Sequence, residues 1–545
     1  MIYIDPPYNT GNDFIYQDDF TQDRSEYDLD AGNVDEEGNR FRKNTHTNGR
    51  FHSDWCSMMY SRLLVARKLL RNDGAIFISI GVEELSNLKS ICDEIFGEQN
   101  FIEIFSWVKT STPPSLAIKS RKTNEYILCY EKNRSNIEYE GEKLDGGDQP
   151  LLNSGNPKAV LKFPEGVIFF NKEKFPNGIY SPMKPDKVKL LNEIEIVDGY
   201  TNCEVLLEGE FKWTQEFLNQ EIAKGTTFII KSNKLSIRFI RNEEGYKKPT
   251  NFIPEKYTTP IISKKNSEVG TNENASSELA QLMGKEVFSY PKPVSLVDYI
   301  LNFVCRENDI VMDFFSGSGT TAEAVFTNNL KHRKNLQLIL VQLAEDLDAN
   351  LKVADQRSKL TVQNGITLLD SIGKPHKLTE LAKERIRRAG KQIKNELDLT
   401  SQTLDVGFRV FKCDESNMKD VYFEPKDLQQ QDLINFMDNI KEDRTDLDLL
   451  FDCMLKWGVQ LSEPIEKKLV GESTIYNVND GNLVACFSEK ITREVIDQIT
   501  SLEPLRVVFR DGSFEEASEK MNLFEIFKQK CDWSDDEVRK NVRVI

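Results

Sequence analysis

The apolar run AIFISI at residues 75–80 constrains the fold more than any other segment of this sequence. It lacks polar alternation, which is typical of a strand buried on both faces between layers of helices. Residues 54–70 and 82–96 on either side carry apolar residues at helical spacing. Three further apolar runs repeat the alternation, at residues 126–130, 309–314 and 336–343. The pattern predicts the α/β class, with a doubly wound Rossmann-like core that binds ligands at the carboxyl ends of its strands.

The character of the chain changes between residues 135 and 285. Short strand-like pieces there alternate with many Lys and Glu residues and with turn signals such as DGGD and FPNG. We therefore expect an inserted domain at 135–285, which divides the core into parts at 1–134 and 286–400. An α+β C-terminal domain is expected at 401–545. The 545 residues suffice for three or four domains of ordinary size.

The net charge of −17 has the wrong sign for a protein that coats nucleic acid with its whole surface. If the protein binds nucleic acid, the contacts must therefore come from local basic patches, each of which is otherwise an ordinary solvated face. The candidate patches are Arg40, Arg42 and Lys43; Lys119, Arg121 and Lys122; and Lys383, Arg385, Arg387, Arg388, Lys391 and Lys394.

The nine cysteines include no C-x-x-C pair, and only four histidines are present. This composition favours a reducing compartment and predicts neither disulfides nor a metal site. The sequence also shows no membrane-length apolar run and no signal-peptide pattern at its start. We therefore expect a cytoplasmic protein without a membrane partner.

The tetrapeptide Asp5-Pro6-Pro7-Tyr8 follows a strand-like run at residues 2–4. One reaction that this motif suits is the methylation of an adenine amino group. Such a group is a poor nucleophile, because its lone pair is delocalised into the ring. The Asp5 carboxylate and the Pro6 carbonyl can accept its two hydrogens and draw electron density onto the nitrogen, while Tyr8 stacks an extruded base. Methyl transfer then needs mainly in-line positioning. We expect these four residues to be catalytic; a plain turn is the alternative.

The segment DFFSGSGTT at residues 313–321 follows a second strand-like run. Its glycines let the backbone approach a ligand closely, and the following helix start offers free N–H groups to a carboxylate. The third glycine of a dinucleotide site and the lysine of a phosphate loop are missing, which disfavours NAD and ATP. The expected cofactor-binding residues are Asp5, Asp313, Phe315, Ser316, Gly317, Gly319, Thr320 and Glu345.

Glu345 follows the run at 336–343, where an acidic residue can hold ribose hydroxyls. Asp346 and Asp348 compete for that role. An ordinary loop is the alternative reading of the segment at 313–321 as a whole.

The order of these two motifs resembles the beta class of amino-methyltransferases. Longer segments resemble the modification subunits of type III restriction-modification systems: residues 49–55, 58–63, 73–80, 95–101, 270–273, 290–293, 455–458 and 508–514. The resemblance implies S-adenosyl-L-methionine as the cofactor and N6 of adenine in double-stranded DNA as the target. It also implies that Lys292 and Pro293 line the cofactor pocket.

The same resemblance implies roles for the outer regions. The insert at 135–285 would be the target-recognition domain, and the C-terminal domain would contact DNA or a helicase-nuclease restriction subunit. A homodimer is also implied. The chain departs from the family in having Asn124-Glu125-Tyr126 where His-Glu-Tyr is expected. It also lacks the long segment that precedes the catalytic motif in family members, which indicates a truncated product or a separately supplied piece.

Two alternatives stay open. An N4-cytosine methyltransferase uses similar acceptors, but more often carries Ser at the position of Asp5, so adenine is favoured. A catalytically impaired DNA-binding or assembly subunit would keep the fold without the reaction; the intact tetrapeptide favours catalysis. A C5-cytosine enzyme is excluded, because none of the cysteines follows a proline.

Overall fold

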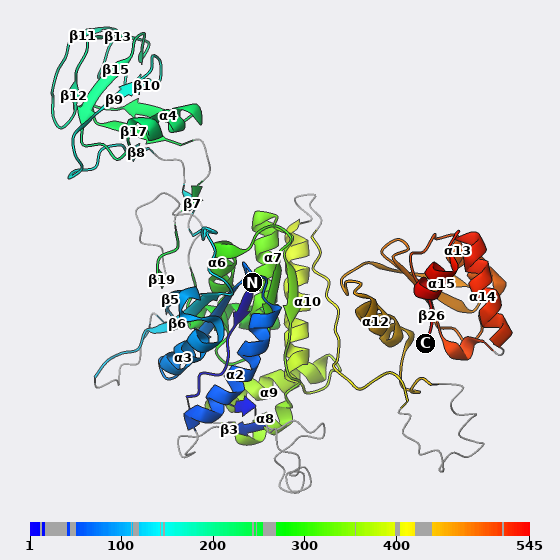
Figure 1. Ribbon diagram of the computed structural model, residues 1–545. Coiled ribbons are helices and arrows are strands. Elements are labelled where there is room, and N and C mark those ends of the chain that lie inside the picture. The colour runs from blue at the N-terminus through cyan, green and yellow to red at the C-terminus, as the bar shows by residue number, and fades with distance from the viewer. Residues whose placement is uncertain are drawn as a thin grey trace. The chain divides into compact units, whose positions relative to one another are not determined.

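The chain forms two compact units, residues 1–406 and 407–545, in the computed structural model (Figure 1). The structure describes residues 1–10, 14–16, 41–43, 51–110, 112, 119–141, 143–144, 148–241, 245–246, 248–253, 269–354, 356–397, 404–419, 439–514 and 517–545.

A seven-stranded sheet forms the centre of the first unit. Its order is β19 (Phe252–Ile253), β5 (Phe101–Val108), β6 (Asn124–Glu131), β4 (Ala75–Ile80), β1 (Ile2–Ile4), β20 (Ile310–Asp313) and β21 (Gln337–Leu340). The strands β4, β1, β20 and β21 run parallel, with Ile2 opposite both Ile76 and Met312. The apolar runs of the sequence therefore become the middle of one sheet.

The sheet is mixed, with parallel and antiparallel neighbours. Strand β6 runs antiparallel to both β4 and β5, with Ile80 opposite Tyr126. The run at β4 is buried along its whole length, but burial on both faces does not depend on the direction of the neighbouring strand. The apolar pattern therefore predicts that residues 75–80 form a buried strand, but it does not predict whether the neighbouring strands run parallel or antiparallel to it.

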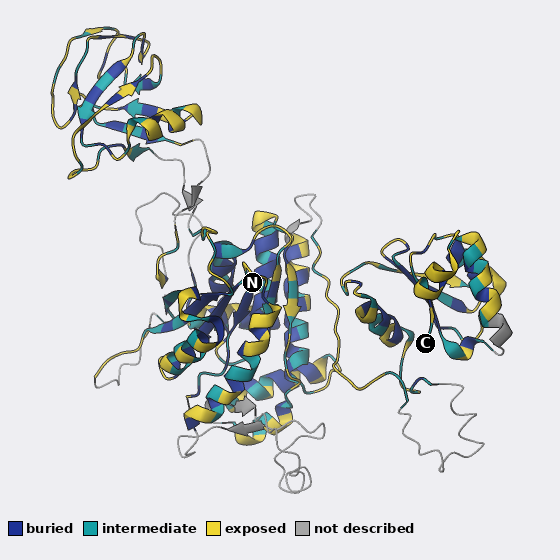
Figure 2. Cartoon of the chain, viewed as in Figure 1, coloured by how far each residue is buried: buried dark blue, intermediate teal, exposed yellow. Residues whose placement is uncertain are grey.

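Helices cover both faces of the sheet, and their inward sides are buried (Figure 2). On one face, α2 and α3 bury Trp55, Met59 and Leu88 against Ile2 and Ile78. On the other face, α6 and α7 complete a separate apolar layer around Tyr3 and Phe77. The helices of this unit outside the insert are α2 (Phe51–Leu69), α3 (Leu85–Phe96), α5 (Asn272–Met283), α6 (Val294–Val304), α7 (Thr320–His332), α8 (Leu347–Val353), α9 (Gln356–Ser371) and α10 (Leu378–Leu397).

Residues 149–240 build small sheets around an apolar core of their own, which extends from Leu151 to Phe239. This core is narrower than the insert expected at 135–285, because β19 joins the large sheet and α5 packs against α10. Its elements are β8 (Gln149–Pro150), β9 (Ala159–Phe163), β10 (Ile168–Phe170), β11 (Gly178–Tyr180), β12 (Lys189–Leu190), β13 (Ile194–Val197), β14 (Tyr200–Thr201), β15 (Val205–Gly209), α4 (Gln215–Ala223), β16 (Thr227–Ile230) and β17 (Ile237–Ile240). Two short pairs complete the strands, β2 (Phe14–Tyr16) with β3 (Phe41–Lys43) and β7 (Lys143–Leu144) with β18 (Gly245–Tyr246).

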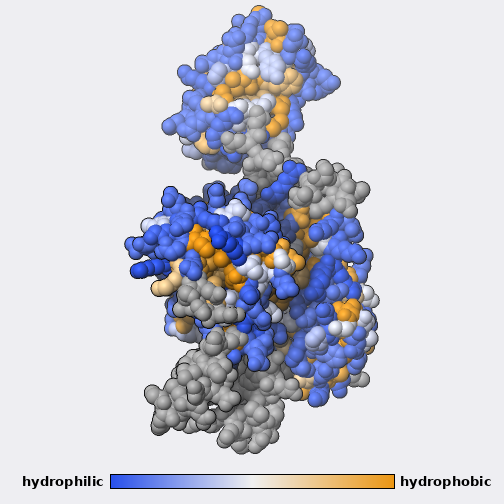
Figure 3. All heavy atoms as spheres, turned by 90° about the vertical axis from the view of Figure 1, so that its right-hand side faces the viewer, coloured by the Kyte–Doolittle hydropathy of each residue, from blue (hydrophilic) through white to orange (hydrophobic). Residues whose placement is uncertain are grey.

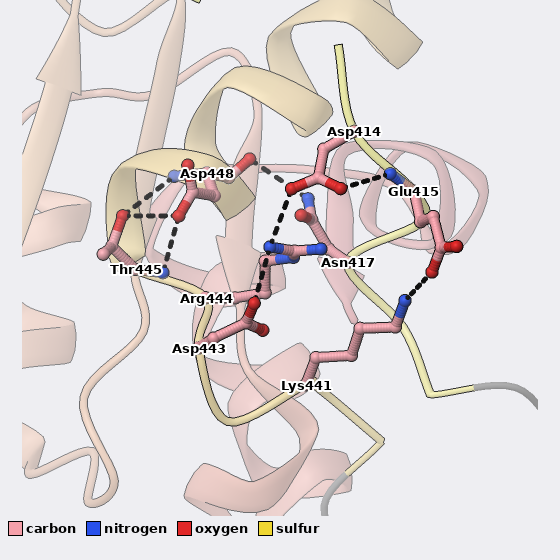
Figure 4. Close-up of polar contacts among 8 residues, drawn as sticks. All are labelled: Asp414, Glu415, Asn417, Lys441, Asp443, Arg444, Thr445 and Asp448. Carbon is pink, nitrogen blue, oxygen red and sulfur yellow. Dashed lines mark hydrogen bonds and ion pairs between the residues drawn. The ribbon is translucent and has the colours of Figure 1, made fainter. Parts of the chain in front are cut away.

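The second unit has a five-stranded sheet: β22 (Ile465–Val470), β23 (Ser473–Val478), β24 (Leu483–Cys486), β25 (Val507–Phe509) and β26 (Val542–Val544). Its helices are α12 (Asp446–Trp457), α13 (Arg493–Thr500), α14 (Ala517–Lys530) and α15 (Asp535–Asn541). Figure 4 shows polar contacts at the start of α12: Arg444 reaches Asp414 and Asp443 at 3.2 and 3.1 Å, and Thr445 with Asp448 forms a capping box. These contacts fasten the segment around residue 414 to the helix start.

The surface in Figure 3 is mainly hydrophilic, with scattered hydrophobic patches, in keeping with the mean hydropathy of −0.49. None of the helices in the described part of the chain has the length and apolar character that crossing a bilayer requires.

Truncation of the buried β4 side chain in Ile78→Ala should lower the free energy of unfolding by about 2–5 kcal/mol, since it leaves a cavity between the sheet and α2. Urea unfolding followed by tryptophan fluorescence measures the loss. Val65→Ala on the exposed side of α2 is the control, with an expected change within about 0.5 kcal/mol. Equal effects from the two variants would contradict the placement of β4 in the core.

Candidate active site

The two sequence motifs meet at one edge of the large sheet. Asp5 follows β1, Asp313 ends β20, and Gly81 follows β4. Because these three strands are adjacent and parallel, their carboxyl ends lie side by side. Burial raises the pKa of Asp313 to about 7, and the negative charge of Asp5 adds a smaller contribution. The structure therefore brings the DPPY loop and the glycine loop together.

Side chains from α2 and from the segment after β4 hold the DPPY loop in place. Trp55 Nε1 donates to the Pro7 carbonyl at 2.7 Å. Asn9, which is fully buried and has a φ of +58°, donates to Glu84 Oε1 at 2.5 Å and to the Phe51 carbonyl at 3.2 Å. Asparagine tolerates this left-handed conformation better than most residues, so it ends the loop with a sharp turn.

A network of charged side chains surrounds the Asp5 carboxylate. Lys292 Nζ lies 2.9 Å from Asp5 Oδ1, 3.0 Å from Asp5 Oδ2 and 3.5 Å from Glu125 Oε2. The Tyr8 hydroxyl donates to Glu125 Oε2 at 3.1 Å, and Lys109 Nζ lies 3.0 Å from Glu125 Oε1. The Lys292 ammonium also lies 4.8 Å from the centre of the Tyr8 ring. One buried lysine thus links the catalytic acid, a second acid and the candidate stacking ring.

Burial and pairing set the charges in this network. Burial raises the pKa of Asp5 above the usual carboxyl value, and the nearby Lys292 only partly opposes this. Burial also disfavours a charged Lys292 and a charged Glu125. The negative charges of Asp5 and Glu125 outweigh that cost and raise the pKa of Lys292, and the positive charges of Lys292 and Lys109 lower the pKa of Glu125. Lys292 is therefore the shared counter-charge of Asp5 and Glu125.

The glycine loop between β20 and α7 is tied to the end of β20. Asp313 Oδ1 accepts a bond from the Phe315 backbone N–H at 3.0 Å, and Oδ2 accepts one from the Thr321 hydroxyl at 2.5 Å. Gly317 and Gly319 have φ values of +49° and +81°, in the left-handed region that favours glycine. The loop therefore turns sharply into the first residue of α7, Thr320.

Glu345 lies close to this loop through one intermediate residue. Gln342 Oε1 accepts a bond from the Gly317 N–H at 2.8 Å, and Gln342 Nε2 donates to Glu345 Oε1 at 3.4 Å. Of the two competing acids, Asp346 caps α8 by accepting from Ala349 N, and Asp348 pairs with His376. Glu345 also accepts a bond from Asn350 Nδ2 at 3.3 Å, so all three acids are engaged locally, and it is the connection through Gln342 that links Glu345 to the glycine loop.

The structure assembles Asp5, Tyr8 and Lys292 around one network, and Asp313, Gly317 and Glu345 around the neighbouring loop. Pro293 is the cap residue that begins α6, directly after Lys292. Glu125 and Gln342 are not among the site residues predicted from the sequence. The only signal for Glu125 was its place in Asn124-Glu125-Tyr126; Gln342 carried none beyond its nearness to Glu345. Both become visible only through pairings across the sheet.

The basic residues predicted to form patches differ in their exposure and pairing. Arg385 on α10 is only 3% exposed, so its side chain is not part of an exposed basic face. Lys122 is exposed and pairs with Glu83, and Arg388 pairs with Glu384. The patch at 40–43 lies outside the residues whose side chains the structure describes.

The fold and the site agree with the class of protein that comparison identifies. The family model for DNA methylases matches residues 1–333, which include both motifs. A relative from Escherichia coli, the type III restriction-modification enzyme EcoP15I Mod subunit, is 30% identical over 97% of this chain and 79% of its own length. The EcoPI Mod subunit of Escherichia phage P1 is 33% identical over 63% of this chain and 54% of its own length.

The chain therefore belongs to the DNA methylase family and, within it, to the Mod subunits of type III restriction-modification enzymes. Among solved structures, a cytosine-N4-specific PvuII DNA methyltransferase covers 68% of this chain and 85% of its own, at 12% identity and a TM-score of 0.28. A likeness at that level says nothing about the substrate of this chain.

The pKa of Asp313, raised by burial to about 7, makes a pH-dependent contribution to stability. An unfolded aspartate titrates near pH 4, so the folded unit binds an extra proton between about pH 4 and pH 7, and this contribution declines as the pH rises through that window. In Asp313→Asn the dependence is lost. The difference in unfolding free energy, wild type minus variant, should fall from pH 5 to pH 7 by up to about 1.4 kcal/mol per unit.

Urea titrations at half-unit steps of pH measure this difference, and above pH 7 it should level off. A difference that stays constant from pH 5 to pH 8 would show that Asp313 is ionised in the folded protein throughout.

Proposed function

We propose that this protein transfers a methyl group from S-adenosyl-L-methionine to the exocyclic N6 of adenine in double-stranded DNA. The single observation that carries the proposal is the convergence of the Asp5 network and the glycine loop at the adjacent ends of β1 and β20. The Asp5 network can hold the target amine, and the glycine loop can hold the cofactor beside it. Membership of the Mod family supports DNA as the substrate.

The glycine loop fits the cofactor. A Cβ added at Gly317 would lie 3.3 Å from the Phe288 ring, so only glycine leaves the close approach open. Peptide N–H groups at the start of α7 suit a carboxylate, and the Glu345 carboxylate suits ribose hydroxyls. We assign Asp313, Phe315, Ser316, Gly317, Gly319, Thr320 and Glu345 to this pocket, with Asp5, Lys292 and Pro293 on its other side. When bound, S-adenosyl-L-methionine supplies a methyl group on a sulfonium that leaves as a thioether.

The residues of the DPPY loop act on the target amine. The Asp5 carboxylate accepts one N–H of the amine, and the Pro6 carbonyl accepts the other. Both acceptors raise the electron density on the nitrogen. The Lys292 ammonium already meets both oxygens of Asp5, which supports the ability of this carboxylate to take nitrogen donors. The C–N bond would form as the methyl–sulfur bond of the bound cofactor breaks, and the amine would then release one proton, which the Asp5 carboxylate would accept.

Tyr8 supplies the stacking surface for a base that has left the duplex. Its ring is held from three sides: Glu125 accepts from its hydroxyl, Lys292 lies over it, and a Cβ at Gly81 would be 3.1 Å from Cδ2. A ring fixed in this way loses little entropy when a base stacks on it, and such stacking contributes about 1–3 kcal/mol.

The outer regions complete the proposed system. The insert expected at 135–285 serves as the target-recognition domain, and the independent apolar core within residues 149–240 suits a module that reads base edges. The region at 401–545 contacts DNA or the restriction subunit with its helicase and nuclease activities. The chain works as a homodimer in the cytoplasm.

Replacement of the catalytic acid tests the reaction. Asp5→Asn should lower methyl transfer by about a hundredfold or more, because an amide is a weaker acceptor than a carboxylate. Incorporation of labelled methyl groups into mixed-sequence DNA measures the rate, and Asp480→Asn at an exposed turn of the second unit is the control. Mass spectrometry of the digested product should find N6-methyladenine. N4-methylcytosine would overturn the target, and equal rates in wild type and Asp5→Asn would remove Asp5 from the mechanism.

Substitution of the glycine loop tests the cofactor site. Gly317→Val forces a branched side chain into the left-handed region and toward Phe288, with a strain of about 1–3 kcal/mol. The affinity for S-adenosyl-L-methionine, measured by calorimetry, should fall by about tenfold or more. Gly373→Val is the matched control, because Gly373 also has a positive φ of +62° but lies at the end of α9. Equal affinity in the Gly317 variant and the wild type would mean that the pocket lies elsewhere.

A further inference from the structure

Arg385 lies on α10 but points away from solvent. Sequence analysis grouped it with five other basic residues of this helix as a possible phosphate contact. The structure gives its side chain 3% exposure, against 45% for Arg387 two positions later. Neighbours in sequence are thus divided between the interior and the surface, and the interior one needs another explanation.

The guanidinium of Arg385 binds the end of the glycine loop and the start of α7. Nη1 donates to Ser318 Oγ and to Thr320 Oγ1, both at 2.7 Å. Nε and Nη2 contact Glu323 Oε2 at 3.0 and 2.9 Å. Ser318 and Thr320 flank Gly319, so a single planar group fixes both sides of the left-handed glycine. Arginine suits this task because its donors have a fixed fork geometry.

Burial of the charged Arg385 side chain costs desolvation free energy, and this cost is not explained if the contact only joins α10 to α7. Burial lowers the pKa of Arg385, and Glu323 is its counter-charge. Glu278 of α5 lies near the same pair, and its pKa is raised by burial and by Glu323. A buried ion pair is weak as a source of stability, because desolvation offsets the attraction. Apolar side chains could join α10 to α7 equally well, but they could not orient two hydroxyls of the loop.

Helix α10 also contacts the remainder of the proposed pocket. Ile386, the next residue, would lie 3.4 Å from a Cβ at Gly319, so the helix backs directly on the loop. At the first residue of the helix, the Leu378 N–H donates to the Glu345 carbonyl at 2.9 Å. The same helix therefore holds the glycine loop through Arg385 and the acid beside it through Leu378.

We propose that Arg385 is a positioning residue for the cofactor pocket: it fixes Ser318 and Thr320 so that the backbone of the intervening glycine turn keeps the shape that the cofactor needs. This inference rests on the proposed function, which places S-adenosyl-L-methionine at the loop. Arg385 does not touch the reacting atoms, and it does not contact DNA.

The test compares Arg385→Gln and Arg385→Lys with Arg387→Gln, the exposed control on the same helix. Calorimetry with S-adenosylhomocysteine, the demethylated cofactor product, gives the affinity without any turnover. Arg385→Gln should weaken binding by about tenfold or more, since it removes charge-assisted hydrogen bonds. Arg385→Lys should restore part of the affinity, and Arg387→Gln should leave it within about twofold. DNA binding over a range of salt concentrations should keep its slope in Arg385→Gln.

A second set of variants tests the route of the effect. Ser318→Ala with Thr320→Val removes the two acceptors and keeps Arg385. This double variant should weaken binding by itself, and adding Arg385→Gln to it should cost less than Arg385→Gln costs in the wild type. If Arg385→Gln fails to fold, as judged by thermal melting, Ser318→Ala alone decides the matter, because it removes one acceptor of Arg385 and leaves Thr320 of the proposed pocket unchanged.

The outcomes separate this proposal from the previous one. Folded wild-type protein that does not bind S-adenosylhomocysteine would contradict the proposed function. Wild-type binding together with an unchanged affinity in folded Arg385→Gln, or in the Ser318 and Thr320 double variant, would overturn only the role of Arg385. A shallower salt dependence of DNA binding in Arg385→Gln would show instead that Arg385 contacts DNA phosphates.

Discussion

The parallel pairing of β1 with β4 on one side and β20 on the other is the contact on which the site depends. Strand β1 has only three residues, but all three are buried and paired, and Asp5 comes directly after them. Because β20 belongs to a distant part of the sequence, this pairing alone brings the glycine loop next to the acid. The helices on both faces then bury the strand so deeply that its register is fixed by the packing of Ile2 and Ile4.

A single buried ammonium organises the chemistry at that edge. Lys292 precedes α6, Asp5 follows β1, and Glu125 lies near the start of β6, so their ion pairs join three separate elements. Removing one member of such a cluster leaves the others as uncompensated buried charges, which is costly. The same cluster positions the Tyr8 ring through Glu125 and Lys292. The Lys292–Glu125 pair therefore helps to position both the Asp5 carboxylate and the Tyr8 ring.

The behaviour of α10 illustrates a limit of reading charge from sequence. Its basic residues look alike along the chain, but the helix buries one side and exposes the other. Arg385 turns toward the hydroxyls of the glycine loop, while Arg388 pairs with Glu384 and donates to carbonyls at the end of α5. In a chain with a net charge of −17, several basic side chains are committed to internal pairing, and counting them overestimates what nucleic acid can meet.

The sequence by itself determined the buried strands, most of the flanking helices and the two motifs. Apolar periodicity and the special backbone of proline and glycine are local properties that need no partner. The strand at Ala75–Ile80 was readable in this way, and the helix predicted at 54–70 is observed at Phe51–Leu69. Only the tertiary structure decided that β6 runs antiparallel, which carries Glu125 to the active edge, and that Gln342 joins Gly317 to Glu345. Those contacts depend on strand direction and on side-chain reach across the sheet, and neither is encoded in the periodicity of a single segment.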